Sequence, residues 1–163
     1  IRAPLDVLSP YSSTIFFRAL ALEAMTRVDF YVLANSSERD HERMICRVVE
    51  KAFRHGHEIY VLCSDAAEVK RFDETLWRFQ DTSFVPHVCD SGDAPVVIGT
   101  TASDIANPDV LVNLANEVPD TVSSFQRVIE SAGFDDPTRG AARTRYRYYQ
   151  DRGFPLHTHK ISA

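Results

Sequence analysis

This chain of 163 residues lacks long apolar runs and has few cysteines. No apolar stretch approaches the roughly 20 residues that a membrane span needs, so no membrane segment is expected. The three cysteines, Cys46, Cys63 and Cys89, are an odd number without close spacing. This pattern is typical of reduced, mostly buried thiols and favours neither a disulfide framework nor a zinc site. We therefore expect a cytoplasmic protein.

Positive charge is scarce over most of the chain. The net charge is −5 and the calculated pI is about 5.6. General binding to duplex DNA depends on many cationic contacts with phosphates, so this balance argues against it. The length suits one domain with a substantial core, and hydrophobic residues make up 44% of the chain.

The first 24 residues differ from the rest of the chain. Pro4 and Pro10 interrupt any regular element, and the short apolar run that ends at Phe17 is followed by Arg18. A signal peptide has basic residues before an uninterrupted apolar centre, and this segment has neither. We expect residues 1–24 to be an N-terminal extension outside the fold, and residues 25–163 to form the domain.

Within that domain, short apolar runs alternate with segments of helical spacing. This alternation predicts a mostly parallel sheet with helices on both faces, which is an α/β doubly wound fold. Strands are predicted at 28–33, 58–63, 85–88, 96–98 and 110–114, and helices at 41–54, 65–79, 122–132 and 138–152.

Glycine is also scarce, and its absence at one turn excludes a common function of this fold. The first strand is followed by the turn Ala34 to Glu38, which has no glycine and carries a carboxylate. A nucleotide site would need glycines there, so that backbone amides could approach the phosphates. The sequence therefore has no nucleotide-binding loop, and no cofactor is expected.

Candidate catalytic and metal-binding residues are weak. Cys63 ends a strand, but Ser64 and Asp65 after it are better interpreted as a helix cap. His157 and His159 lie two residues apart, and two ligands make a poor metal site. We therefore expect no catalytic residue, no bound metal and no enzymatic activity.

The segment from Arg139 to Lys160 is the exception to the scarcity of positive charge. It has a net charge of +5, so the other 141 residues sum to −10. Arg139, Arg143 and Arg147 recur every four positions, and Tyr146 falls on the same side, so one face of a helix carries three guanidinium groups and a ring. This face suits carboxylates that lie next to an apolar group. The alternative is an ordinary solvated basic helix.

Several segments, taken in order, resemble the chi subunit of bacterial DNA polymerase III, an accessory protein of the clamp loader. The resemblance runs from Met25 to about Lys160. The segments that carry it are Asp29 to Leu33, Phe72 to Trp77, Ser83 to His87, Asp109 to Leu114, and Ala142 to Tyr149 with Gly153 and Phe154 beyond it.

The resemblance implies a fold, a function and partners. The family has a Rossmann-like fold without nucleotide binding, performs no chemistry, and acts in DNA replication. Its members link the clamp loader, through the small subunit psi, to the acidic C-terminal tail of single-stranded-DNA-binding protein, which ends in phenylalanine. DNA contact is then indirect. By this resemblance the tail-binding residues are Arg139, Arg143, Tyr146, Arg147, Gly153 and Phe154.

The resemblance also implies a psi-binding surface. It comprises Trp77, Phe84, Val85 and Pro86, and a helicase is an alternative partner for it. Tryptophan often anchors protein interfaces. The alternative from the residues alone is core packing, because Trp77 shares its helix with Val69, Phe72 and Leu76.

Two other functions compete with the linking role. A direct single-stranded nucleic-acid-binding module would use the tyrosines for stacking and the arginines for phosphates. A nucleotide-using α/β enzyme would need a phosphate site, and the sequence offers none.

Overall fold

A computed structural model describes residues 25–102 and 109–162 of the chain. The predicted extension, residues 1–24, lies outside the described residues. The elements in chain order are β1 (Arg27–Leu33), α2 (Glu38–Arg54), β2 (Ile59–Leu62), α3 (Ala66–Arg78), β3 (His87–Cys89), β4 (Val96–Gly99), β5 (Val110–Asn113), the short 3₁₀ helix η1 (Val122–Ser124), β6 (Arg127–Ser131), α4 (Asp136–Asp151) and β7 (Leu156–Ile161).

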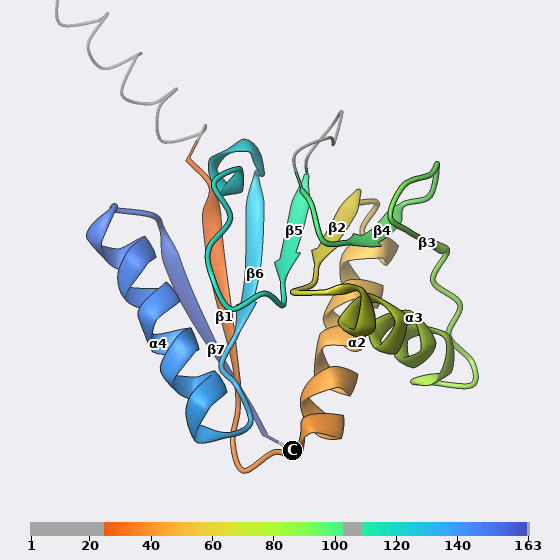
Figure 1. The fold of residues 1–163 in the computed structure, drawn as a ribbon, viewed down its shortest axis with the longest axis horizontal. Helices are drawn as coiled ribbons and strands as arrows, with labels where there is room; N and C mark the ends of the chain where they lie inside the picture. The colour runs from red at the N-terminus through yellow and green to blue at the C-terminus, as the bar shows by residue number, and fades with distance from the viewer. Residues whose placement is uncertain (1–24, 103–108, 163) are drawn as a thin grey trace, which may run out of the picture.

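The seven strands form one sheet in the order β3-β4-β2-β5-β6-β1-β7, and every pair in it is parallel. Helices α2 and α3 lie on one face of the sheet and α4 lies on the other (Figure 1). The prediction of an α/β doubly wound fold is confirmed.

Each face of the sheet has its own core. The central strands β2 and β5 are buried along their whole length, as their mainly apolar sequences require. Alternate side chains of each strand point to opposite faces. Under α2 and α3 the core includes Val61, Val112 and Ile129, whereas under α4 it includes Phe30 and Tyr149.

The predicted helix at 122–132 is wrong. This segment forms η1 and then the buried strand β6. Val128, Ile129 and Glu130 are consecutive and all fully or almost fully buried. A strand covered on both faces buries consecutive residues, and a short apolar run of that kind is hard to distinguish from a buried helix by spacing alone.

The strand β7 was not among the predicted strands. It pairs with β1 and places His159 beside the buried carboxylate of Asp29, with 2.7 Å between His159 Nε2 and Asp29 Oδ1. Arg127 Nε donates to Asp29 Oδ2 at 2.7 Å, and Arg27 Nη2 donates to Oδ1 at 3.0 Å. Burial raises the pKa of Asp29, but hydrogen bonds from His159, Arg127 and Arg27 outweigh burial and hold the pKa below its ordinary value.

Candidate functional site

Helix α4 begins with a strong capping arrangement. The Asp135 carboxylate accepts from the Thr138 backbone N–H at 2.9 Å, and Thr138 Oγ1 accepts from the Asp135 N–H at 3.1 Å. A Cβ on Gly133 would collide with the Thr138 side chain, so the first turn of the helix packs directly on the backbone that leaves β6. Arg139 Nε donates to the Gly133 carbonyl at 3.2 Å. These contacts fix the position of Arg139, the first of the three arginines on the basic face of α4.

The inner side of α4 is held by an ion pair that the sequence did not reveal. Arg145 Nε donates to Glu130 Oε2 at 2.8 Å, and both side chains are buried. Asn113 and Tyr149 donate to the other carboxylate oxygen, each at 2.8 Å. Burial raises the pKa of Glu130, while Arg145, Asn113 and Tyr149 oppose that rise.

Two arginines of α4, Arg143 and Arg145, point in opposite directions. Arg145 is two positions after Arg143, about 200° around the helix, so it faces the sheet while Arg143 faces solvent. The one signal in the sequence that could have identified this ion pair is a charged residue, Glu130, that directly follows the apolar residues Val128 and Ile129.

A groove lies between α4 and the strands β1 and β7. It encloses about 480 Å³. Its apolar lining includes Phe30, Val32 and Ala142, and the side chains of Arg139, Arg143 and Tyr146 also line it. The structure therefore brings together three of the six residues that the resemblance assigned to tail binding.

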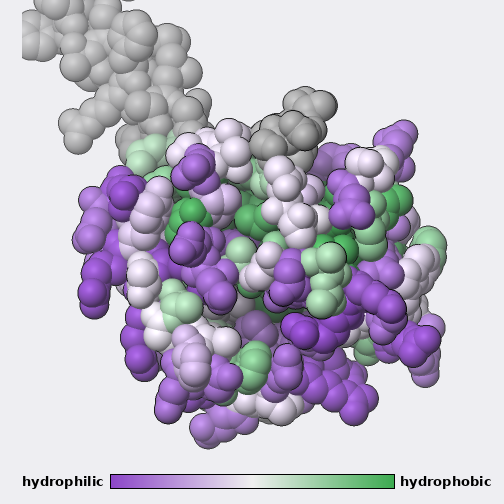
Figure 2. Space-filling model, viewed as in Figure 1, coloured by the Kyte–Doolittle hydropathy of each residue, from purple (hydrophilic) through white to green (hydrophobic). Residues whose placement is uncertain are grey.

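Tyr146 is fixed in this groove by packing. Its ring meets the Phe30 ring edge-on, with 5.1 Å between the ring centroids. Arg143 is exposed, and it has no ion pair with any carboxylate in the part of the chain that the structure describes. Hydrophilic residues lie along the outer side of α4 (Figure 2). An exposed guanidinium beside an apolar groove suits a ligand with both a carboxylate and an aromatic or aliphatic side chain.

The other three predicted tail-binding residues do not line the groove. Arg147 is exposed one turn beyond Arg143. Gly153 follows the end of α4 with a φ of +74°, a conformation that glycine adopts without strain. Phe154 is half-buried and packs edge-on against Tyr149, with ring centroids 5.4 Å apart. Phe154 therefore supports the core on the α4 side.

A second surface lies at the end of α3, on the opposite face of the sheet from α4 (Figure 1). Trp77 is 49% exposed and Phe84 is 65% exposed, with 5.5 Å between their ring centroids. The Trp77 ring also lies 4.5 Å from the His87 ring, which is buried. Asp73 Oδ1 lies 2.9 Å from His87 Nε2 as an ion-pair contact, though not in hydrogen-bonding geometry.

The four predicted psi-binding residues differ in how far they are exposed. Trp77 and Phe84 lie on the surface, so core packing does not explain them. Val85 is 2% exposed and belongs to the core under α2 and α3, and Pro86 is half-buried. Large exposed aromatic side chains in contact with one another are a feature of protein-interaction surfaces.

The carboxyl ends of the strands, where a doubly wound fold usually binds nucleotides, form a cavity of about 380 Å³. Four carboxylates line it, and the cations there are Arg71 and Arg145. Arg71 already pairs with Glu42, at 2.8 Å, and Arg145 pairs with Glu130. A phosphate would meet excess negative charge, in agreement with the missing glycine turn.

The described residues contain no cluster of three or more metal-ligating side chains. His157 is exposed, and His159 is bound to Asp29. No helix in residues 25–102 and 109–162 has the length and apolar character needed to span a membrane.

Residues 25–157 match the family described as DNA polymerase III chi subunit, HolC. The chain belongs to this family. Its similarity to curated chi subunits covers nearly all of their length. It is 37% identical to DNA polymerase III subunit chi of Pseudomonas aeruginosa over 84% of this chain and 98% of that protein. It is 30% identical to subunit chi of Escherichia coli, over 82% of this chain and 97% of that protein. Identity is also 30% to subunit chi of Haemophilus influenzae, over 81% and 95%.

The fold of this chi family member also resembles a solved structure outside the family. T4 UvsW superposes with a TM-score of 0.61 over 85% of this chain and 42% of that chain, at 8% sequence identity. At such low identity the likeness concerns the α/β fold alone.

Proposed function

We propose that this chi subunit is a non-catalytic link in the DNA polymerase III holoenzyme. It would bind the acidic C-terminal tail of single-stranded-DNA-binding protein on one face and the clamp-loader subunit psi on the other. The observation that carries the proposal is the groove in which Arg139 and Arg143 flank an apolar lining fixed by Phe30 and Tyr146.

The tail has two chemical features, a terminal phenylalanine with a free carboxylate and acidic residues before it. The apolar part of the groove suits the phenylalanine ring, since aromatic pairs gain about 0.5–1.5 kcal/mol beyond area burial. The Arg143 guanidinium suits the carboxylate, because its planar fork donates two parallel hydrogen bonds. The remaining acidic residues would be attracted by the positive charge along α4.

The place of the second surface supports a linking role. Trp77 lies on α3 with Phe84 against it, whereas the groove lies beneath α4, and the sheet separates α3 from α4 (Figure 1). Two partners can then bind at once without competing. We assign Trp77 and Phe84 to the psi contact, with Pro86 at its edge and Val85 supporting it from the core. A helicase that carries a similar apolar segment is an alternative partner for the same surface.

The proposed role requires no chemistry and no cofactor. It places the protein in the cytoplasm at replication forks, where its contact with DNA is made through its partners.

Fluorescence anisotropy with a labelled tail peptide tests the proposal. The full peptide should bind, and removal of its terminal phenylalanine should abolish most of the affinity. Tyr146→Phe should retain binding because the ring remains against Phe30. Equal affinity for the peptides with and without phenylalanine would contradict the proposal.

A further inference from the structure

The strand β7 ends the sheet and has an unpaired edge. Six residues, Leu156 to Ile161, pair with β1 on one side and have no strand on the other within the described chain. Unpaired strand edges present rows of N–H and C=O groups to which an extended segment can add.

The pairing with β1 fixes which backbone groups face outward. Val28 N–H donates to the Pro155 carbonyl at 2.9 Å, and Val28 is in register with Leu156. In a β-strand, the N–H and C=O groups of one residue point to the same side, and those of the next residue point to the opposite side. The N–H and C=O groups of His157 and His159 therefore point toward β1. Those of Leu156, Thr158 and Lys160 point to the open edge.

Thr158 joins this open edge to the groove under α4. Thr158 is one of the residues that line the groove. Its backbone N–H and C=O groups, by the alternation above, point to the open edge. A peptide whose end occupies the groove therefore passes directly beside unpaired backbone groups.

The charge along β7 favours an acidic occupant. The strand carries one cation, Lys160, and no acidic residue. Beside it, the single carboxylate of Asp29 is shared by Arg27 and Arg127, which leaves positive charge in excess.

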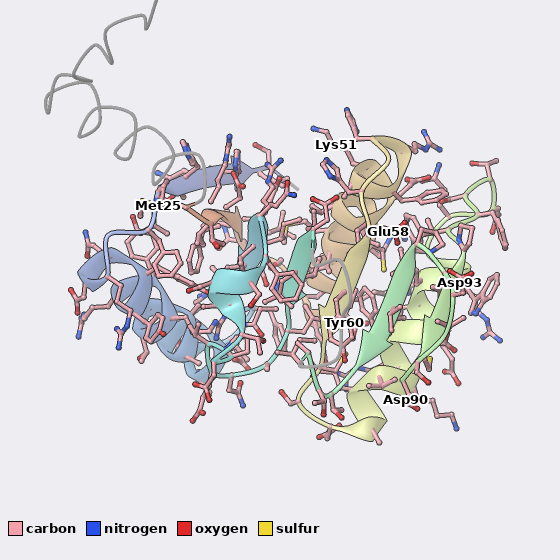
Figure 3. The ribbon with its side chains drawn as sticks, turned by 90° about the horizontal axis from the view of Figure 1, so that it is seen from above. Met25, Lys51, Glu58, Tyr60, Asp90 and Asp93 are labelled. Atoms are coloured by element: carbon pink, nitrogen blue, oxygen red, sulfur yellow. The ribbon has the colours of Figure 1, made fainter. Side chains whose placement is uncertain are left out.

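The opposite edge of the sheet differs in length and charge. The strand β3 has three residues, and Asp90 and Asp93 follow it (Figure 3). An acidic peptide would be repelled there, so the two edges are not equivalent.

We propose that the acidic segment before the terminal phenylalanine adds to the edge of β7 as an eighth strand. This inference rests on the proposed function, since it concerns the same ligand, but it assigns a surface outside the groove. The added strand would lie about 4.8 Å from β7 and would pair through every second residue. Backbone pairing would supply affinity, and the groove would select the phenylalanine.

Peptides alone test this without altering the protein. A short peptide of about three residues that ends in phenylalanine reaches only the groove, whereas a long acidic peptide of about nine residues reaches both surfaces. Two further long peptides carry N-methyl groups on alternate backbone nitrogens upstream of the phenylalanine, in one register or in the other. Their charge and side chains are identical.

We expect the long peptide to bind at least about tenfold more tightly than the short one. N-methylation in the pairing register should remove most of that gain, and N-methylation in the other register should leave it. Hydrogen exchange of the Thr158 and Lys160 amides should slow by about tenfold with the long peptide and not with the short one.

A matched pair of protein variants provides an independent check. Lys160→Pro removes an outward N–H, a change that an edge strand tolerates, while Lys160→Gln removes only the charge. Lys160→Pro should weaken the long peptide more than Lys160→Gln does, and neither should affect the short peptide.

The outcomes separate the two proposals. If both methylated peptides bind like the unmodified long peptide and the two amides stay unprotected, strand addition is refuted, while binding of the short peptide keeps the groove assignment intact. If the short peptide fails to bind, or if it binds Tyr146→Ala as tightly as the unaltered protein, the groove assignment itself is refuted.

Discussion

The ring of Tyr146 on α4 meets the ring of Phe30 on β1 edge-on, with centroids 5.1 Å apart and planes at 66°. This contact couples the basic helix to the sheet and fixes one wall of the groove. Arg143, one turn before Arg147, extends from a helix whose inner side is anchored by Arg145 and Glu130. The proposed ligand would therefore meet a preformed surface, which lowers the entropic cost of binding.

The buried ion pair between Arg145 and Glu130 should contribute to stability. Arg145→Ala should destabilise the protein by about 3–5 kcal/mol, because it leaves the Glu130 carboxylate buried without its charged partner. Arg143→Ala, on the same helix but exposed, should change stability by no more than about 0.5 kcal/mol. Urea denaturation of both variants measures the difference.

The stability deficit of Arg145→Ala should depend on pH. Burial raises the pKa of Glu130 in the folded protein and Arg145 opposes that rise, so removing Arg145 should raise the folded-state pKa further. The deficit is therefore small at acidic pH, where Glu130 is protonated with or without Arg145, and it grows as the pH rises above the folded-state pKa of the intact protein. The deficit should be larger at neutral pH, and adding Glu130→Gln should reduce it. A deficit that is constant with pH and unaffected by Glu130→Gln would show that lost packing, not charge, causes it.

The surface formed by Trp77 and Phe84 should contribute to psi binding. Trp77→Ala and Phe84→Ala should each weaken psi binding by about 2 kcal/mol or more, the usual effect of an aromatic interface anchor. Because both side chains are exposed, the melting temperature should hardly change. Val85→Ala is the matched control: it should lower stability by about 1–3 kcal/mol, since Val85 is buried. Calorimetric titration with psi gives the affinities, and unchanged psi binding by both aromatic variants would remove this surface from the contact.

The domain boundary can be tested with a truncated protein. A protein that begins at Met25 should fold and bind the tail peptide as the whole chain does, because the family match spans residues 25–157. Thermal denaturation and peptide anisotropy compare the two. A loss of several degrees in melting temperature would indicate that residues 1–24 contribute to the fold.

The sequence predicted the sheet but not every strand. The strands β1, β2 and β5 contain short, mainly apolar runs because both faces of the sheet are covered, and such runs are easy to recognise even though Asp29 and Asn113 are polar. The strand β7 reads Leu-His-Thr-His-Lys-Ile, since an edge strand is half-exposed and tolerates polar residues. The segment of β6 has the apolar spacing of a helix because its neighbours Val122 and Phe125 extend the pattern of Val128 and Ile129 by coincidence.

Helical periodicity in the sequence predicts the part of the groove that α4 contributes, but not the part that β1 contributes. The row of Arg139, Arg143 and Tyr146 follows from helical spacing alone. The apolar lining from Phe30 and Val32 does not, because these residues are distant in the sequence and meet the helix only through the order of the strands. The role of Arg145 was equally inaccessible, since its partner Glu130 lay in a segment assigned to the wrong element.

The most direct measurement of the central claim is the affinity of the tail peptide for Arg143→Ala and Arg147→Ala, compared at two salt concentrations. Both variants lose the same charge, but only Arg143 lines the groove. Arg143→Ala should lose about 1.5–3 kcal/mol of binding free energy, the range for a charge-assisted hydrogen bond, and should lose much of it even at high salt. Arg147→Ala should lose less, and its effect should vanish as salt rises, because exposed charges are screened beyond about 10 Å at 0.1 M salt. If Arg143→Ala bound the peptide at full strength, or if the two variants were indistinguishable at both salt concentrations, the groove would not be the tail-binding site.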